Sequence, residues 1–116
     1  MEPSSLRVRL RLLPAGAVEV AVAGEVDVAV ADDLAAVSRL VRTCDPTSVD
    51  LDLGGVTFID LHGLRSLDEL ARDQEAHGTM VRERRTPGCV QHLRTLVAAA
   101  TARASHVSEA RSVEVA

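Results

Sequence analysis

Apolar and polar residues alternate in the first part of the chain with the period of two that is typical of β-strands. In residues 7–13 three arginines alternate with valine and leucine, and in residues 18–24 three valines alternate with Glu19 and two alanines. Each run therefore has one apolar face and one polar face. The turn-forming sequence Pro14-Ala15-Gly16 lies between the two runs, which predicts a β-hairpin.

The spacing of apolar residues changes to three and four between residues 28 and 43, which predicts a helix with one apolar side. That side is formed by Val30, Leu34, Val37 and Val41. Residues 48–53 alternate again and predict a third strand. We expect the pair Gly54-Gly55 to interrupt this strand before a short apolar return at residues 56–59. A strand, a helix and a strand in this order predict two parallel strands joined by a right-handed crossover.

A second helix is predicted to begin after Asp60, a residue type that caps helix N-termini, and to end at Gly78, which suits the C′ position. Its apolar stripe is formed by Leu61, Leu64, Leu67 and Ala71. Residues 79–85 are expected to form a fourth strand. Only Met80 and Val81 are apolar in that run, so we interpret it as an exposed edge strand whose charges block aggregation.

A third helix is predicted to begin at Pro87-Gly88. The residues expected to face the core are Val90, Leu93, Leu96 and Val97. From about Thr101 the periodic signal fades, which leaves room for disorder in part of the tail. We therefore predict an α/β domain over residues 6–100 and a weakly defined segment at residues 101–116. The element order ββαβαβα implies a four-stranded mixed sheet packed against helices.

The composition argues against several classes of function. The length of 116 residues suits one domain, and 47% of the residues are apolar. Phe58 is the single aromatic residue, so the core must be aliphatic and there is no aromatic platform on which bases could stack. The net charge of −4 also argues against nucleic-acid binding, which needs a basic surplus. The first residues do not resemble a signal peptide, and no apolar run approaches the roughly 20 residues that span a bilayer. We expect a cytoplasmic protein that binds neither nucleic acid nor membrane.

The residues that could carry chemistry are scattered. Cys44 and Cys89 lie far apart in the sequence and outside any CxxC motif, so we expect two buried, reduced thiols. The histidines show no ligand spacing, and we expect no metal and no cofactor. No nucleophile elbow, phosphate loop or Cys/His arrangement is present, so we expect no enzymatic activity. A hydrolase that uses Glu25, Asp27 and Asp60 is the weakest of the functions considered.

Two sequence blocks resemble the STAS domains of bacterial anti-sigma-factor antagonists. The first is Gly24-Glu25-Val26-Asp27, directly after the second strand. The second is Asp52-Leu53-Gly54-Gly55-Val56-Thr57-Phe58-Ile59-Asp60, continued by Gly63-Leu64-Arg65-Ser66-Leu67 at the start of a helix. The resemblance covers roughly residues 6–100 and is strongest at residues 50–67. It implies a protein-interaction module that binds an anti-sigma factor and so regulates transcription that depends on a sigma factor.

The resemblance also implies a phosphorylation switch, from which this sequence departs. In the family, a Ser or Thr follows the residue equivalent to Asp60, and a partner that is both anti-sigma factor and serine-protein kinase phosphorylates it. Here Leu61 occupies that position and His62 the next one. We therefore expect a binding surface without its usual switch. The residues expected to contact the partner are Glu25, Asp27, Asp60, Leu61, His62, Gly63 and Arg65.

Several alternatives stay open at this stage. Ser66 and Thr57 are candidate replacement phosphosites. His62 is either an exposed polar residue or a pH sensor, and Gly63 fits either a close partner backbone or crowding within the fold. A second function is a small-ligand sensor or scaffold, in which Gly54-Gly55 and the helix start would hold a nucleotide or another anion. A homodimer is also left open.

Overall fold

The computed structural model describes residues 5–115, with side chains described for residues 5–104. The four strands are β1 (Arg7–Leu12), β2 (Ala17–Val26), β3 (Ser48–Ile59) and β4 (Met80–Arg84). The three α-helices are α1 (Ala31–Thr43), α2 (Leu61–Ala76) and α3 (Gly88–Val115). Two short 3-10 helices, η1 (Pro14–Gly16) and η2 (Val28–Val30), complete the order. Within the described residues, no helix is both long enough and apolar enough to cross a membrane.

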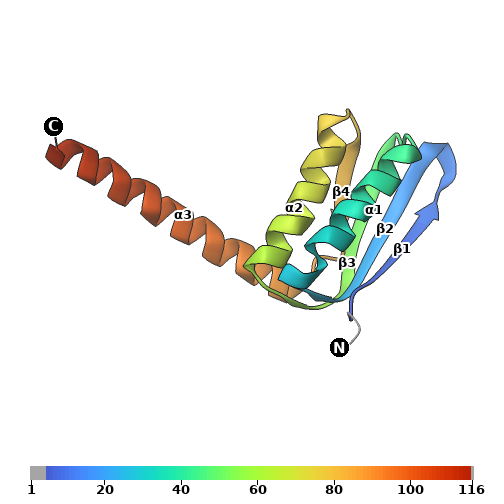
Figure 1. Ribbon diagram of the computed structural model, residues 1–116, viewed down its shortest axis with the longest axis horizontal. Helices are drawn as coiled ribbons and strands as arrows, with labels where there is room; N and C mark the ends of the chain where they lie inside the picture. Colours follow the sequence, from blue (N-terminus) through green and yellow to red (C-terminus); the bar gives the residue numbers. More distant parts are fainter. Residues whose placement is uncertain (1–4, 116) are drawn as a thin grey trace.

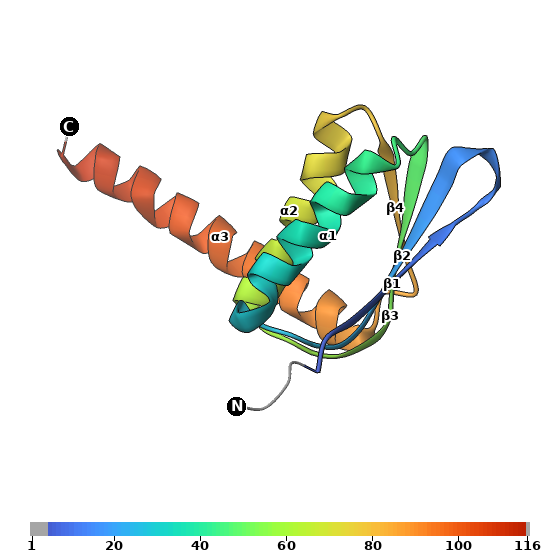
Figure 2. The same cartoon turned by 45° about the vertical axis from the view of Figure 1, so that its right-hand side comes forward.

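The strands form one mixed sheet in the order β1-β2-β3-β4. β1 and β2 are the antiparallel hairpin that the sequence predicts, while β2 with β3 and β3 with β4 are parallel pairs. α1 and α2 lie side by side on one face of the sheet, and α3 projects away from it (Figures 1 and 2). The predicted element order and the four-stranded mixed sheet are therefore confirmed. β4 is an edge strand, as its charge pattern indicated.

An aliphatic core fills the space between the sheet and the helices. The central strands β2 and β3 supply most of its valines and leucines, because both have neighbours on either side and one covered face. The helices contribute Val30, Leu34, Val41, Leu64, Leu67, Leu70 and Val90. The predicted apolar side of α1 is confirmed. In α2 the buried stripe runs through Leu70 instead of Ala71, and Leu61 lies at the exposed end of the helix.

The predicted break in the third strand is wrong. β3 continues through Gly54 and Gly55 to Ile59, and the register against β2 shifts between Ala21 and Ala23. A Cβ atom on Gly55 would lie 2.6 Å from the Cβ atom of Ala23, so a larger residue would push the strands apart. The glycine pair thus permits a local irregularity in the pairing, and the strand does not end there.

Three smaller differences concern the helices. The predicted helix over residues 28–43 is divided into η2 and α1. α3 continues to Val115, beyond the point where the sequence pattern fades. Leu96, which was expected to face the core, is 52% exposed, whereas Leu93 and Val97 do pack against the core.

The two cysteines are exposed, so the prediction of buried thiols is wrong. Cys44 is the C-cap residue of α1, and Cys89 lies in the first turn of α3. Both therefore occupy helix ends, which reach the surface in this fold.

Candidate functional site

The residues that the sequence singles out converge at one edge of the sheet, where β2 and β3 end next to each other. In the parallel register Glu25 lies opposite Phe58, and Val26 lies opposite Ile59. The chain then leaves each strand through an aspartate, Asp27 or Asp60, and enters a helical segment. Segments more than thirty residues apart in the sequence thus begin their helices side by side. Ligand sites of α/β folds commonly lie at this carboxyl edge of parallel strands.

Asp60 is the N-cap residue of α2. Its side-chain Oδ1 atom accepts a hydrogen bond of 2.8 Å from the backbone N–H of Gly63. Its own backbone N–H donates to the carbonyl oxygen of Val26 over 3.2 Å, which ties the start of α2 to the end of β2. The predicted cap is confirmed. The start of α2 is fixed by two hydrogen bonds of Asp60, one to the helix and one to the end of β2.

Gly63 is explained by this close approach of helix and strand. A Cβ atom at position 63 would overlap the carbonyl oxygen of Val26 and crowd the Val26 side chain. Crowding within the fold therefore accounts for the glycine, and a partner backbone is not needed to explain it.

Asp27 has a similar structural role one strand away. Its Oδ1 atom accepts a hydrogen bond of 3.0 Å from the backbone N–H of Ala29 and so caps η2. Asp27 and Asp60, two of the three carboxylates considered for a hydrolase, thus serve as helix caps. Among the described residues, no group of three or more His, Cys, Asp or Glu side chains is arranged to hold a metal ion.

Apolar side chains are exposed at the same edge. Val28 is 61% exposed, Phe58 50% and Leu61 37%. They lie on the three segments that meet here: η2, the end of β3 and the start of α2. Together with Glu25, Asp27, Asp60, His62 and Arg65 they form what we call the edge surface. Exposed large apolar residues beside charged ones are typical of protein interaction sites.

His62 and Arg65 are both exposed on the first turns of α2. Within the described part of the chain, neither side chain has a hydrogen bond or an ion pair. Sequence reasoning named both residues but missed Val28 and Phe58. The signal for Phe58 was present, because a lone phenylalanine in an aliphatic protein stands next to the Asp60 motif.

The two candidate replacement phosphosites are placed differently from the acceptor position. The Ser66 hydroxyl donates a 3.0 Å hydrogen bond to the carbonyl oxygen of His62, one turn earlier in the same helix. Ser66 also lines a groove of about 570 Å³ between α1 and α2, together with Ser38 and Asp73. Thr57 is exposed on β3, next to Phe58. Both sites adjoin the edge surface, because Thr57 precedes Phe58 and Ser66 follows Arg65 and bonds to His62.

The family of the chain follows from comparison with known proteins. The family model described as "STAS domain" matches residues 14–97. The chain therefore belongs to the STAS domain family, as the motifs around Asp27 and Asp60 indicated. No curated protein sequence is similar enough to this chain to count as a match.

Solved structures support the same fold. An anti-sigma factor antagonist from Mycobacterium paratuberculosis has a TM-score of 0.63 and 24% identity, covering 86% of this chain and 85% of that one. The anti-sigma factor antagonist SpoIIAA in its unphosphorylated form has a TM-score of 0.57 and 17% identity, with coverage of 76% and 82%. A sulfate transporter family protein from Wolinella succinogenes has a TM-score of 0.62 and 22% identity, with coverage of 76% and 71%. At these identities the similarity shows the fold, and the fold occurs in both antagonists and transporter-family proteins.

Proposed function

We propose that this chain is a cytoplasmic protein-interaction module that binds an anti-sigma factor through the edge surface and so regulates transcription dependent on a sigma factor. The observation that carries the proposal is the combination of a doubly held helix start at Asp60 with exposed apolar side chains around it. Because the backbone that carries Leu61 and Phe58 is already rigid, this surface would lose little conformational entropy when a partner binds.

We further propose that phosphorylation does not switch this surface at the usual place. Leu61 is the first residue of α2 and has no hydroxyl group. In the family a phosphate at this position would place about 1.5 to 2 negative charges in the interface. Here the same position adds an apolar contact. The contact of Leu61 with the partner is therefore not switched on and off by phosphorylation.

The interface role of the edge surface is tested by Leu61→Asp. We expect binding to the partner anti-sigma factor to weaken about 30-fold, because a carboxylate would be buried where an apolar contact is lost. Leu40→Asp is the matched control, since Leu40 is 54% exposed on α1 and lies outside the edge surface. Isothermal titration with each anti-sigma factor of the same cell measures the affinities. Equal affinity of both variants would remove Leu61 from the interface, and no complex with any of these factors would contradict the function.

The absence of a switch is tested by a kinase reaction. We expect no phosphate to be incorporated when the chain is incubated with ATP and the partner kinase. Phosphate located by mass spectrometry on Thr57 or Ser66 would refute the unswitched version while leaving the binding function intact. Variants Thr57→Val and Ser66→Ala would then identify the acceptor.

The small-ligand alternative has less support. Gly54 and Gly55 lie within β3, and the backbone N–H of Gly54 already donates to Asp52 Oδ1 over 2.9 Å. The Arg85 guanidinium lies over Gly54 as well, at 3.0 Å from where a Cβ atom would be. The pair therefore does not form the anion cradle that the sequence suggested. Thermal-shift measurements with nucleotides discriminate the two functions, because a ligand of the folded state raises its stability.

A further inference from the structure

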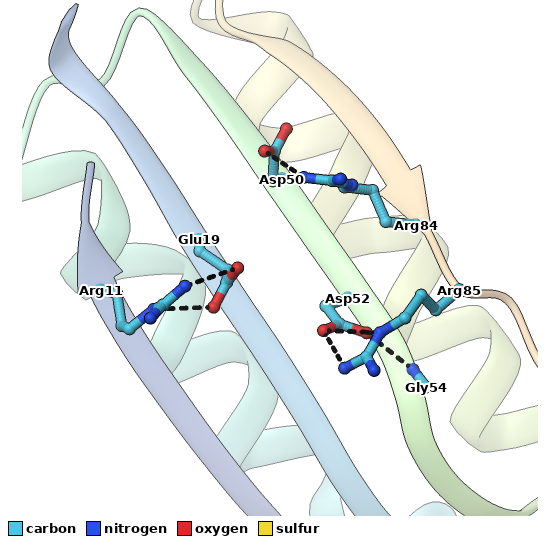
Figure 3. A network of polar contacts seen from close by, with 7 residues as sticks. All are labelled: Arg11, Glu19, Asp50, Asp52, Gly54, Arg84 and Arg85. Carbon is cyan, nitrogen blue, oxygen red and sulfur yellow. Dashed lines mark hydrogen bonds and ion pairs between the residues drawn. The ribbon is translucent and has the colours of Figure 1, made fainter. Parts of the chain in front are cut away.

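The face of the sheet opposite α1 and α2 is rich in arginine. Side chains alternate between the two faces of a strand. On this face, residues 7, 9 and 11 of β1 and residues 82 and 84 of β4 are all arginine. Arg85, just after β4, folds back over the same face (Figure 3). We call this surface the arginine face. Its arginines are Arg7, Arg9, Arg11, Arg82, Arg84 and Arg85. The chain as a whole has a net charge of −4, so this clustering opposes the overall balance.

Three of the carboxylates on the arginine face are paired, and a fourth, Glu25, lies on the same face of β2 because it alternates with the buried Gly24 and Val26. The three paired carboxylates each contact one arginine, as Figure 3 shows. The pairs are Glu19 with Arg11 at 3.0 Å, Asp50 with Arg84 at 3.3 Å, and Asp52 with Arg85 Nε at 3.0 Å. Six arginines against four carboxylates, Glu25 included, leave an excess of two positive charges on this face.

Two of the three unpaired arginines, Arg7 and Arg9, border a hollow. Within residues 5–104 no ion pair or hydrogen bond is formed by the side chains of Arg7, Arg9 or Arg82. Arg7 and Arg9 line a hollow of about 340 Å³ on β1, and Arg85 lines its opposite side. The lining between them includes the small residues Ala21, Ala23 and Gly55 and the carboxylate of Asp52, which pairs with Arg85. The hollow therefore combines free guanidinium groups with room for another chain.

The geometry of the face indicates what would occupy it. Alternate residues of a strand are about 6.7 Å apart, so the side chains of Arg7 and Arg9 repeat at this interval. Carboxylates at alternate positions of an extended segment repeat at the same interval. A nucleic acid or an anionic membrane would instead bring continuous negative charge onto Glu19, Asp50 and Asp52. The sequence has a single aromatic residue, Phe58, at the end of β3, so the face offers no row of aromatic side chains on which successive bases could stack.

We propose that the arginine face is a second docking surface, and that its occupant is an extended protein segment with carboxylates at alternate positions. The carboxylates pair with Arg7 and Arg9, and the backbone of the segment lies over Ala21 and Ala23. Guanidinium groups suit this role because they bind carboxylates with two parallel hydrogen bonds. This surface adjoins the edge surface at Glu25 and Phe58, but none of its arginines belongs to the edge surface, and its occupation does not depend on the proposed function.

The test measures binding of the full chain to a fluorescently labelled synthetic peptide of alternating Glu and Ala. The double variant Arg7→Ser/Arg9→Ser should bind about tenfold more weakly, as expected for the loss of two exposed pairings. Arg39→Ser/Arg72→Ser removes the same charge from the helix layer and should bind like the original chain. Leu61→Asp should also leave peptide binding unchanged, which separates this proposal from the edge surface.

A second variant tests the hollow itself. Ala21→Glu places a carboxylate in its lining without removing any arginine, and it should weaken peptide binding at least as much as the double variant. Amide chemical shifts should change at residues 7–11 and 21–23 when the peptide is added. Equal affinity of the arginine variants, or shifts confined to other residues, would overturn the proposal. It would also be overturned if vesicles with anionic lipid, ATP or a second copy of the chain occupied the face in place of the peptide.

Discussion

Gly63 lies where the start of α2 closely approaches the end of β2. Its backbone N–H is capped by Asp60, and a Cβ atom there would overlap the Val26 carbonyl oxygen. A glycine in such a close contact usually cannot be replaced by a larger residue without a loss of stability, because neither the helix backbone nor the strand backbone can move aside alone.

Gly63→Ala should therefore lower the free energy of unfolding by about 1–3 kcal/mol, the usual cost of overpacking. Gly88→Ala is the matched control, since position 88 lies in the first turn of α3 and a Cβ atom there meets nothing within 4 Å. The control should be neutral or slightly stabilising, by less than about 1 kcal/mol. Urea unfolding of both variants gives the comparison, and equal stabilities would show that α2 can shift away from Val26.

At the scale of residues, features that depend on a few neighbouring positions could be predicted from the sequence. Features that depend on contacts between distant segments could not. The cap at Asp60 and the left-handed residue Gly78, with φ of 82°, follow from preferences that act over a few positions. The reason for Gly63 depends on Val26, which is distant in sequence. The exposure of Cys44 and Cys89 likewise depends on which helix ends the fold leaves uncovered.

At the scale of elements, ion pairs join the edge strand β4 to its neighbours. The Arg85 hydrogen bond holds the pKa of Asp52 on β3 below its ordinary value, despite some opposing desolvation. The Arg94 hydrogen bond from α3 lowers the pKa of Glu83 on β4 in the same way. Arg94 also reaches Asp68 of α2 at 3.2 Å, so one arginine connects β4, α2 and α3.

These two carboxylates predict an acid-sensitive contact between elements. Because their pKa values are lower in the folded state, their contribution to stability is complete above the ordinary values of 3.8 and 4.5. It is lost as the pH falls through the lowered pKa values. The free energy of unfolding should therefore drop as the pH falls below about 5, and Asp52→Asn/Glu83→Gln should reduce this drop.

The control for the pH experiment is Asp45→Asn/Glu75→Gln. Both residues are exposed, and neither has an ion pair in the described structure. Denaturant unfolding across the pH range should show the original slope for this control. An unchanged slope in Asp52→Asn/Glu83→Gln would mean that other carboxylates cause the acid sensitivity.

Periodicity identified every strand and α-helix, and two of the boundaries that it misjudged have clear physical reasons. Gly54-Gly55 looks like a strand end, yet β3 continues because β2 and the Arg85 side chain fill the space that the glycines leave. α3 continues past Thr101 although its alanine-rich sequence has no apolar side. Apolar patterning reports burial against a core, and it says nothing where a helix has no neighbour.

At the scale of the whole molecule, α3 extends far beyond the compact part (Figure 1). Among the side chains of α3 that the structure describes, which end at residue 104, Val97 is the last that packs against the core, and residues 98–104 are exposed. Removal of residues 102–116 should therefore change the free energy of unfolding by less than about 0.5 kcal/mol, as is usual for surface positions. A loss of more than about 1 kcal/mol on urea unfolding would show that the compact domain extends past residue 101.

The leucine at position 61 also has a consequence for how the concentration of such a protein would control its binding in a cell. A leucine cannot be esterified and hydrolysed in cycles, so under the proposed unswitched function the affinity of the edge surface for a partner would be set when the chain is made. Occupancy then follows mass action alone. Synthesis and degradation of the chain would become the variables under control, and the response would be a titration curve whose midpoint is set by the abundance of the partner.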